Sequence, residues 1–405
     1  MPLARLFLPC AAFFVATASS LPAAAPASLS FRKLELNREF LAEGGTFGDL
    51  NRDGHADAIA GPFWYAGPDF TKRHELYPPK PFDPLGYSDN FSAWVRDFNG
   101  DNWPDIFAIG FPGQDAFWLE NPGEEGGAWK RHVVYAPVDN ESPTFGQLIA
   151  GQPPVLICMS NGRIGYATPH ADDPSMPWKF HAVSAPRGWG KFTHGLGFGD
   201  VNADGRVDLL APDGWFEQPA SLEGDPLWKH HPASFGNGAH IHVVDINGDS
   251  LPDVVTSLNA HGYGLSWFEQ IRTDAGGIEF REHPILSKTD EKIAGVQFSQ
   301  LHAVEIVDMD GDGLPDILTG KRWWAHGPTK DPEPNAAPVV YVFLLRRSAT
   351  GEVSFEPALI DDASGLGTQI VAQDINSDSR PDVITVNKRG TFVFLSQPAS
   401  SSTLP

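Results

Sequence analysis

Short runs of apolar residues, separated by turn residues, recur along most of this chain. Val243–Val244 and Val254–Val255 form one such pair of runs, with an acidic turn between them. Runs of this length bounded by turn signals predict β-strands rather than helices. We therefore expect an all-β protein made of many short strands.

The acidic turn between paired runs is an internal repeat. Six copies carry Asp or Asn at relative positions 1, 3, 5 and 9. The copies are Asp49, Asn51, Asp53, Asp57; Asp97, Asn99, Asp101, Asp105; Asp200, Asn202, Asp204, Asp208; Asp245, Asn247, Asp249, Asp253; Asp308, Asp310, Asp312, Asp316; and Asp374, Asn376, Asp378, Asp382. A seventh unit fits at Gly146 to Pro154 but lacks the oxygen-bearing side chains. First positions at 49, 97, 146, 200, 245, 308 and 374 indicate a repeat architecture of seven units.

A second pattern alternates with the first. An aromatic residue followed by charged residues and His opens a short run in five places, and weaker copies begin at Phe31 and Phe355. The five copies with His are Phe70–His74, Trp129–His132, Trp178–His181, Trp228–His231 and Phe280–His283. Short aromatic strands such as Phe63–Tyr65 lie between the two patterns, so each unit is predicted to contain four strands.

The order of these elements predicts how the chain ends meet. The copy at Phe31 precedes every acidic turn, whereas no such copy follows the last unit, which runs from Asp374 to Leu395. The N-terminal strand should therefore supply the fourth strand of the last unit. We predict a seven-bladed β-propeller of four-stranded blades over residues 28–398, with its ring closed by the N-terminal strand.

Composition and the chain ends indicate which partners and which cellular location to expect. The chain has 41 Gly and 36 Pro, which favour turns. It has 29 basic and 51 acidic residues, and the resulting net charge of −22 argues against nucleic acid as a partner. Arg5 followed by the apolar run Leu6–Ala18 indicates a signal peptide over residues 1–27. We expect a secreted, periplasmic or extracellular protein with no membrane span after cleavage, and a disordered tail at 399–405. Removal of Cys10 leaves the single thiol Cys158, so no internal disulfide is expected.

The acidic turns are predicted metal sites. Side-chain oxygens at positions 1, 3 and 5 of a tight turn converge, and the carboxylate at position 9 closes the shell. An all-oxygen shell suits calcium first and magnesium second, with a structural role in up to six loops. The alternative is that these are ordinary Asp/Asn turns that cap strands without metal.

The histidines that break the repeat point to one end of the ring. His194, His240 and His302 lie five or six residues before a first-position Asp, near the starts of the innermost strands. Hairpins that return to the same end carry His261, Tyr263, Lys321, Arg322 and His326. A ring mouth lined with polar groups is a usual ligand site. These eight residues are the candidate catalytic set, and zinc or magnesium held by His194, His240 and His302 is a candidate cofactor.

Two resemblances follow from these motifs. The Asp-x-Asn-x-Asp-Gly-x-x-Asp loops resemble those of the FG-GAP/VCBS repeat family, which implies a seven-bladed propeller with calcium loops. Stretches between the repeats are similar to the propeller domain of the aldos-2-ulose dehydratases, lyases that act on keto-sugars such as 1,5-anhydrofructose. Those stretches include Glu141–Phe145, Thr193–Gly197, Ala260–Gly264, Ser299–His302, Gly320–Pro328 and Asn387–Gly390.

Two functions from different classes follow. The first is an exported carbohydrate lyase of the dehydratase type, in which histidines or Tyr263 act as base and acid and Lys321, Arg322 or a metal stabilises the enolate. The second is a non-catalytic calcium propeller that binds glycans or protein partners at the cell surface. The two are distinguished by turnover, because only the enzyme should lose turnover, beyond binding, when the mouth histidines are replaced.

Overall fold

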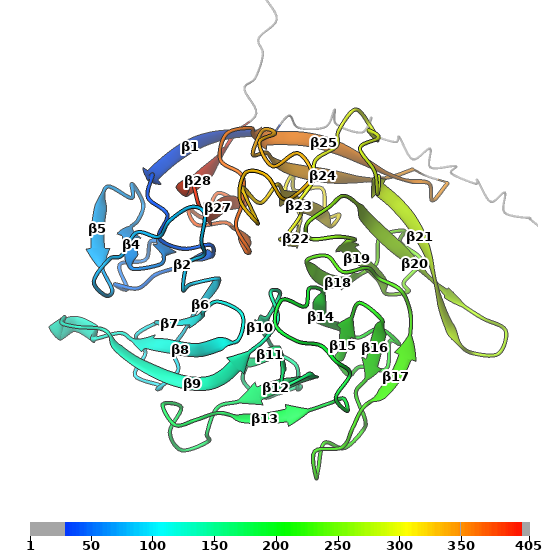
Figure 1. Cartoon of the computed structure of the whole chain (residues 1–405), viewed down its shortest axis with the longest axis horizontal. Coiled ribbons are helices and arrows are strands. Elements are labelled where there is room, and N and C mark those ends of the chain that lie inside the picture. Colours follow the sequence, from blue (N-terminus) through cyan, green and yellow to red (C-terminus); the bar gives the residue numbers. More distant parts are fainter. Residues whose placement is uncertain (1–28, 349, 399–405) are drawn as a thin grey trace, which may run out of the picture.

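The computed structural model describes residues 29–348 and 350–398, which form a propeller-like ring of β-sheets around a central axis (Figure 1). Within these residues the only helical element is the short 3-10 helix η1 (Gly123–Glu125), and no helix there is long and apolar enough to cross a membrane. The predicted all-β class is confirmed. The predicted signal peptide, 1–27, and tail, 399–405, lie outside the described residues.

Strands succeed one another from the centre of the ring outward (Figure 1). The innermost strands are β2 (Gly45–Gly48), β6 (Ser92–Arg96), β10 (Thr144–Gly146), β14 (Leu196–Gly199), β18 (His240–Val244), β22 (Val304–Val307) and β26 (Ile370–Gln373). The second strands are β3 (Asp57–Ala60), β7 (Asp105–Ile109), β11 (Val155–Ser160), β15 (Asp208–Ala211), β19 (Asp253–Ser257), β23 (Asp316–Gly320) and β27 (Asp382–Asn387). Every residue of these second strands is buried, as expected for strands covered on both faces.

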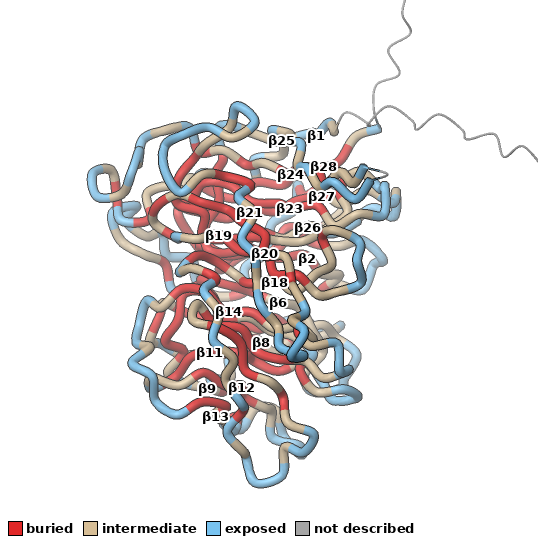
Figure 2. Tube along the Cα trace, turned by 90° about the vertical axis from the view of Figure 1, so that its right-hand side faces the viewer, coloured by how far each residue is buried: buried red, intermediate tan, exposed pale blue. Residues whose placement is uncertain are grey.

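The third and outer strands complete the sheets. The third strands are β4 (Phe63–Ala66), β8 (Gln114–Glu120), β12 (Arg163–Thr168), β16 (Gly214–Glu217), β20 (Leu265–Arg272), β24 (Val340–Arg347) and β28 (Gly390–Gln397). The outer strands are β5 (Lys72–Glu75), β9 (Lys130–Val138), β13 (Lys179–Ala182), β17 (Lys229–Pro232), β21 (Ile278–Leu286), β25 (Val353–Asp361) and β1 (Ser30–Asn37). Figure 2 shows buried residues concentrated in the middle of the ring and exposed residues in the peripheral loops.

The strands form five separate four-stranded sheets and one eight-stranded sheet. The eight-stranded sheet arises because β14 and β18 pair in parallel, with Gly197 opposite Ile241. A Cβ atom on Gly197 would lie 1.8 Å from the carbonyl oxygen of Ile241, so glycine permits this approach. The sequence predicted separate sheets throughout and did not reveal this junction.

The N-terminal strand lies beside the last three strands of the chain. β1 pairs antiparallel with β28, with Arg32 opposite Leu395, and forms the edge of the sheet β1-β28-β27-β26. Lys33 on β1 also forms an ion pair of 2.9 Å with Asp361 at the end of β25. Residues about 360 positions apart in the sequence therefore share one sheet.

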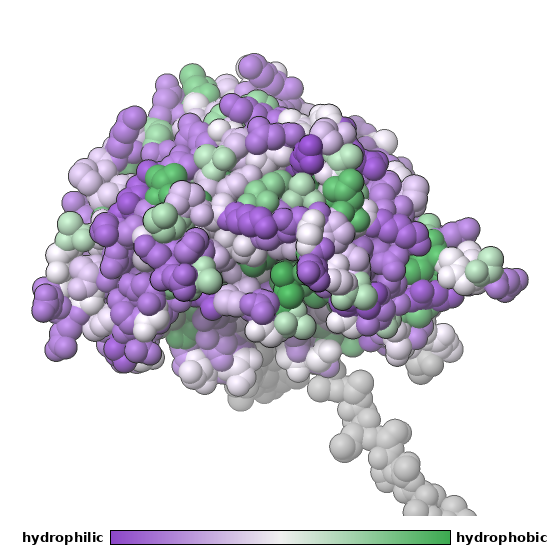
Figure 3. All heavy atoms as spheres, turned by 90° about the horizontal axis from the view of Figure 1, so that it is seen from below, coloured by the Kyte–Doolittle hydropathy of each residue, from purple (hydrophilic) through white to green (hydrophobic). Residues whose placement is uncertain are grey.

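The core consists of apolar clusters between neighbouring sheets. One cluster joins Val255 and Trp267 of β19 and β20 to Ile317 and Phe343 of β23 and β24. Figure 3 shows that hydrophilic residues cover most of the outer edge seen from below, with apolar residues in small separate groups.

The histidines of the outer-strand repeat have a packing role. Each one stacks on the aromatic ring of the adjacent third strand, with centroid separations of 4.0 to 4.7 Å. The pairs are Trp64–His74, Trp118–His132, Tyr166–His181, Trp215–His231 and Trp267–His283. These five side chains are therefore part of the sheets and not of a common site.

Candidate functional site

Three histidines from successive units meet at one end of the ring, which we call the mouth. His194 and His302 each precede an innermost strand by two residues, and His261 lies in the hairpin between β19 and β20. A ring nitrogen of each lies within 4.8 Å of the others, and the ring centroids are 4.6 to 5.3 Å apart. We call these three residues the histidine cluster.

Gln300 holds the connections that carry the cluster. Its backbone N–H donates to the carbonyl of Gly262 at 2.8 Å, and its own carbonyl accepts from the N–H of Arg322 at 2.9 Å. Its side-chain Oε1 accepts from the N–H of Ala325 at 3.1 Å. Gln300 is buried and has a φ of +66°, a costly conformation for a residue with a side chain. Such strain persists where surrounding contacts fix the backbone, and it concentrates at functional sites.

The cluster contains ring nitrogens without hydrogen-bond partners. Among the described residues, Nε2 of His194, Nδ1 of His261 and Nε2 of His302 are buried and make no hydrogen bond, although Oε2 of Glu141 lies 3.3 Å from Nε2 of His194. His194 and His302 are 4% and 2% exposed. An unpaired buried polar atom costs about 1–3 kcal/mol, so three that converge favour a bound ligand. Burial lowers the pKa of His261 to about 3 and that of His302 well below its ordinary value, which keeps both imidazoles neutral.

A buried ion-pair network lies against the cluster. Oε2 of Glu141 is 3.3 Å from Nε2 of His194 and 3.1 Å from Nη1 of Arg322. Nη2 of Arg322 donates to Oε1 of Glu43 at 2.5 Å, and the arginine is 1% exposed. Burial alone would raise the pKa of Glu141, but the close contact with His194 and the charge of Arg322 lower it to about 2. Glu141 is therefore a charged oxygen beside the three imidazoles.

A histidine–aspartate pair forms the outer side of the mouth. Nδ1 of His326 lies 2.8 Å from Oδ1 of Asp331, which is nearly buried, and the His326 ring lies 4.1 Å from that of His261. His326 is 38% exposed. The aspartate fixes the orientation of the imidazole, and Nε2 of His326 has no hydrogen-bond partner among the described residues.

His240 does not join the cluster, which corrects the predicted ligand set. It is the first residue of β18 itself, whereas His194 and His302 precede their strands, so its side chain leaves the backbone at a different point. Nε2 of His240 lies 3.4 Å from the carbonyl of Pro143, and burial and His242 lower its pKa to about 4. The three histidines whose ring nitrogens lie close enough to share a metal ion include His261 in place of His240.

Three other predicted residues have different surroundings from those expected. The hydroxyl of Tyr263 donates to Glu333 at 3.0 Å on the exposed side of the hairpin. Lys321 is fully buried and donates to Oγ of Ser299 at 2.7 Å, and burial lowers its pKa to about 8. Arg322 is enclosed by Glu43 and Glu141, so it is not free to contact a ligand as predicted.

The candidate set derived from the sequence did not include Glu141, Asp331 or Tyr87. Glu141 begins the stretch Glu141–Phe145, whose similarity to the aldos-2-ulose dehydratases was the one signal that pointed to it. Asp331 and Tyr87 lie in long connections without a repeat, where spacing gives no signal. The only features of those connections that could have indicated a functional role are their charged and aromatic residues.

The acidic turns have a repeated hydrogen-bond pattern at position 9. In the first copy, Oδ2 of Asp57 accepts from the N–H of Leu50 at 2.8 Å and Oδ1 accepts from the N–H of Gly67 at 3.0 Å. The same two bonds occur at the other position-9 aspartates, Asp105, Asp208, Asp253, Asp316 and Asp382. Each of these carboxylates begins a second strand and ties the turn to the end of the third strand.

The fifth turn differs from the others. Carboxylate oxygens of Asp308, Asp310 and Asp316 lie within 4.8 Å of one another, a separation that a shared cation requires. Arg346 contacts Asp310 at 2.7 Å and Asp312 at 2.9 Å from the adjacent strand β24. In the described parts of the other five turns, which carry Asn at position 3, the carboxylates do not form such a trio.

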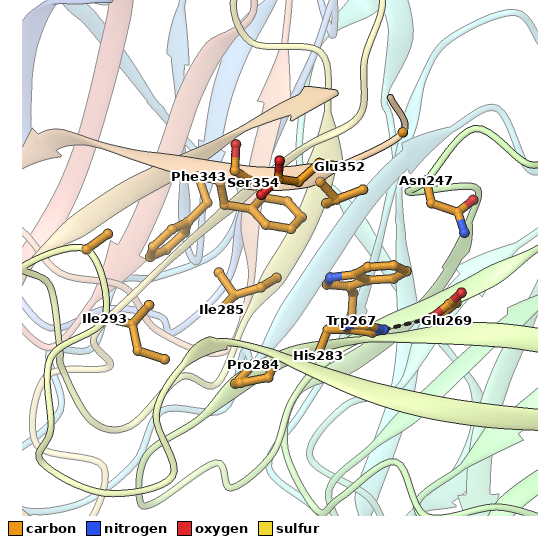
Figure 4. Close-up of a pocket in the computed structure, with 14 residues that line it drawn as sticks. Asn247, Trp267, Glu269, His283, Pro284, Ile285, Ile293, Phe343, Glu352 and Ser354 are labelled. Atoms are coloured by element: carbon orange, nitrogen blue, oxygen red, sulfur yellow. Dashed lines mark hydrogen bonds and ion pairs between the residues drawn. The ribbon is translucent and has the colours of Figure 1, made fainter. Parts of the chain in front are cut away.

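A separate groove of about 570 Å³ lies near the outer edge of the ring (Figure 4). It is lined by residues of two neighbouring sheets, including Trp267, His283, Phe343 and Glu352. The dashed line in Figure 4 marks the hydrogen bond between His283 and Glu269, which belongs to the packing pattern of the outer strands. None of the mouth residues lines this groove.

Comparisons with known proteins support the fold and leave the activity open. No family model matches the sequence, and no curated protein matches it. The structure is similar to that of BBS1N in complex with ARL6DN, with a TM-score of 0.50 and 11% identity over 94% of this chain and 100% of that chain. An identity this low shows similarity of fold alone.

Two further solved structures have lower TM-scores. An auxiliary nutrient binding protein from Bacteroides ovatus has a TM-score of 0.44 and 10% identity over 76% of this chain and 70% of that chain. Rhamnogalacturonan lyase YesW has a TM-score of 0.46 and 12% identity over 90% of this chain and 75% of that chain. The resemblances to the FG-GAP/VCBS repeats and to the aldos-2-ulose dehydratases stay predictions from the sequence.

Proposed function

We propose that this protein is a metal-dependent carbon–oxygen lyase that removes water from a keto-sugar at the mouth of the ring. The observation that carries the proposal is the convergence of three buried ring nitrogens that make no hydrogen bond, from His194, His261 and His302. The substrate class rests on the resemblance of the mouth-forming stretches to the aldos-2-ulose dehydratases.

The donor set fits a first-row divalent metal. His194, His261 and His302 would hold it, with Glu141 as the adjacent carboxylate. Imidazole nitrogens suit zinc, whereas magnesium prefers oxygen ligands, so zinc is favoured over the magnesium that the sequence left open. When bound, the metal supplies a Lewis acid that polarises the sugar carbonyl and stabilises charge on the enolate oxygen.

The residues around the histidine cluster would transfer protons or hold the cluster in position. His326, oriented by Asp331, is the candidate base that removes the proton beside the carbonyl. Arg322 is a positioning residue, because it fixes Glu141, and Glu141 in turn contacts His194. Lys321 is buried and would support the connection through its hydrogen bond to Ser299.

The proposal is tested by measuring the activity of the protein on a panel of keto-sugars, including 1,5-anhydrofructose. The purified wild type should eliminate water from at least one of them, and a strong chelator should abolish this activity. His326→Ala should lose turnover, whereas His170→Ala, a change at an exposed turn, should retain it. Sugar binding without turnover in the metal-loaded wild type would support the non-catalytic, glycan-binding alternative instead.

We also propose that the ring is a seven-bladed propeller stabilised by calcium. The eight-stranded sheet would count as two blades, β14–β17 and β18–β21, and β1 would serve as the outer strand of the last blade and close the ring. The carboxylate trio of the fifth turn supports calcium, with magnesium as the second choice, in a structural role in up to six turns. We propose secretion to the periplasm or the cell exterior on the basis of the N-terminal sequence.

A further inference from the structure

Tyr87 lies against the mouth in a connection that the repeat does not explain. It belongs to the segment between β5 and β6, and its ring centroid is 5.9 Å from Cζ of Arg322 and 4.7 Å from Nζ of Lys388. Phe91 and Phe111 fix the ring from other sides, with centroid separations of 6.4 and 5.1 Å. The phenol is therefore held rigidly beside the network that supports the histidine cluster.

The Tyr87 hydroxyl has no hydrogen-bond partner in the described part of the chain. The hydroxyls of Tyr65, Tyr135 and Tyr263 are bonded, to Asn37, Ser160 and Glu333, whereas those of Tyr77, Tyr166 and Tyr341 also lack a partner, so the position of Tyr87 is what distinguishes it. The charged groups that act on Tyr87 are those of the mouth: Arg322, Glu141, Glu43 and Asp331. Of the seven tyrosines in the chain, Tyr87 alone packs on Arg322 in the described structure.

We propose that Tyr87 is the proton donor to the leaving hydroxyl of the sugar, a role for which the sequence offered the histidines and Tyr263 as candidates. This inference rests on the proposed lyase function. A sugar bound at the histidine cluster would place its far side toward the Arg322 side of the mouth, where the half-buried Tyr87 ring ends in an unbonded hydroxyl. Tyr263 instead donates to Glu333 at the exposed edge of its hairpin.

The step balances without an added reagent. The base takes the proton on the carbon beside the carbonyl, and the electron pair of that C–H bond forms the enolate. As the enolate collapses to the carbon–carbon double bond, the C–O bond breaks and its electrons leave on the hydroxyl oxygen. That oxygen takes the phenol proton and departs as water. The base then releases its proton to solvent, and the phenolate takes up a proton from solvent.

The environment keeps the donor protonated at neutral pH. Burial raises the pKa of Tyr87, and the Arg322 charge opposes this effect only in part. General acid catalysis by a positioned side chain contributes about 10²- to 10⁴-fold. Removing the hydroxyl alone should cost a factor in this range, since phenylalanine keeps the ring contacts with Phe91 and Phe111.

The test compares Tyr87→Phe with the matched variant Tyr166→Phe in the metal-loaded protein, using the keto-sugar that the wild type turns over best. Tyr166 also has an unbonded hydroxyl, but its ring packs on His181 and Trp228. We expect Tyr87→Phe to lose about 10²-fold or more in kcat, with KM, metal content and Tm unchanged. Tyr166→Phe should stay within about twofold of the wild type, as expected for a residue outside the mouth.

A second substrate separates acid catalysis from a structural effect. An analogue with fluoride in place of the leaving hydroxyl needs no proton on its leaving group, so Tyr87→Phe should process it at the wild-type rate. Equal kcat of Tyr87→Phe and wild type on the hydroxyl substrate would overturn the inference, as would a loss of metal or Tm in Tyr87→Phe. A wild type without turnover on any keto-sugar would instead overturn the lyase proposal, and this inference with it.

Discussion

At the scale of single residues, the mouth depends on buried charges that compensate one another. Arg322 joins Glu43 and Glu141, and all three side chains are buried. Burial opposes the charge on Arg322, but the two glutamates outweigh it and raise its pKa above the ordinary value. The network is stabilising only while it is complete, because each carboxylate would be costly without the guanidinium.

Arg322→Met should therefore lower the free energy of unfolding by about 3–5 kcal/mol, since it leaves two buried carboxylates without a cation. Arg389→Met, which removes an arginine that packs on Trp323 nearer the surface, should cost far less. Denaturant unfolding of the two variants measures the difference. Equal midpoints for Arg322→Met and wild type would show that the network does not stabilise the fold.

Glu305 on the innermost strand β22 gives a pH dependence of known sign. Burial raises its pKa to about 7, above the ordinary 4.5, so folding disfavours the ionised form. Between those values the native state binds more protons than the unfolded chain, and this group's contribution to stability falls as the pH rises. Glu305→Gln should therefore match the wild type near pH 4 and exceed it by about 1–3 kcal/mol at pH 8.

The measurement is the free energy of unfolding of both proteins across pH 4 to 8. Glu75→Gln, at an exposed position of β5, is the control and should show no difference that varies with pH. A stability difference for Glu305→Gln that is constant over this range would contradict the assigned cause.

Residue spacing predicted part of the mouth. His194 and His302 were found because both stand six residues before a first-position Asp, and both have that relation to a strand start in the structure. His240 stands five residues before its Asp, and that single step moves it onto the strand and out of the cluster. Glu141, Asp331 and Tyr87 are brought to the mouth by long-range contacts, which no local spacing encodes.

At the scale of elements, the acidic turn has two separable parts. The position-9 aspartate accepts two backbone N–H groups, and this role needs no metal. The oxygens at positions 1, 3 and 5 accept backbone N–H groups within the turn itself, as Asp245 does from Gly248. Position 9 was predicted to close a metal shell, and in every copy its two oxygens also hold the strands together.

Two substitutions in the fourth turn should therefore behave differently. Asp253→Ala removes two buried hydrogen bonds and should cost about 2–3 kcal/mol both with calcium and with a chelator present. Asp249→Asn should lower Tm only in calcium buffer, because an ion that binds the folded state adds stability through linkage. Thermal melts of the two variants in both buffers test this, and a wild-type Tm unaffected by strong chelation would rule out structural calcium.

At the scale of the whole molecule, the order of the elements was the informative feature of the sequence. The sequence contains seven acidic-turn units and seven outer-strand copies, and one outer-strand copy precedes the first unit while none follows the last. This order indicated that the first strand joins the last sheet, and β1 does pair with β28. The merged eight-stranded sheet was not predictable, because it depends on how closely β14 approaches β18 at Gly197.

Deletion of residues 30–37 should destabilise the entire ring. Without β1, the backbone groups of β28 become an open edge, and exposed edges promote aggregation. Size-exclusion chromatography and thermal melting of the deletion variant provide the check. A soluble monomer with the wild-type Tm would show that β1 is dispensable for the ring.

The central claim is that the histidine cluster at the mouth binds a metal, and that His261 belongs to it while His240 does not. Metal analysis of purified His261→Ala and His240→Ala, beside the wild type, tests it most directly. We predict about one zinc per chain for the wild type and for His240→Ala, and a loss of most of that zinc in His261→Ala. Equal zinc in the two variants, or none in the wild type after zinc is supplied, would contradict the account.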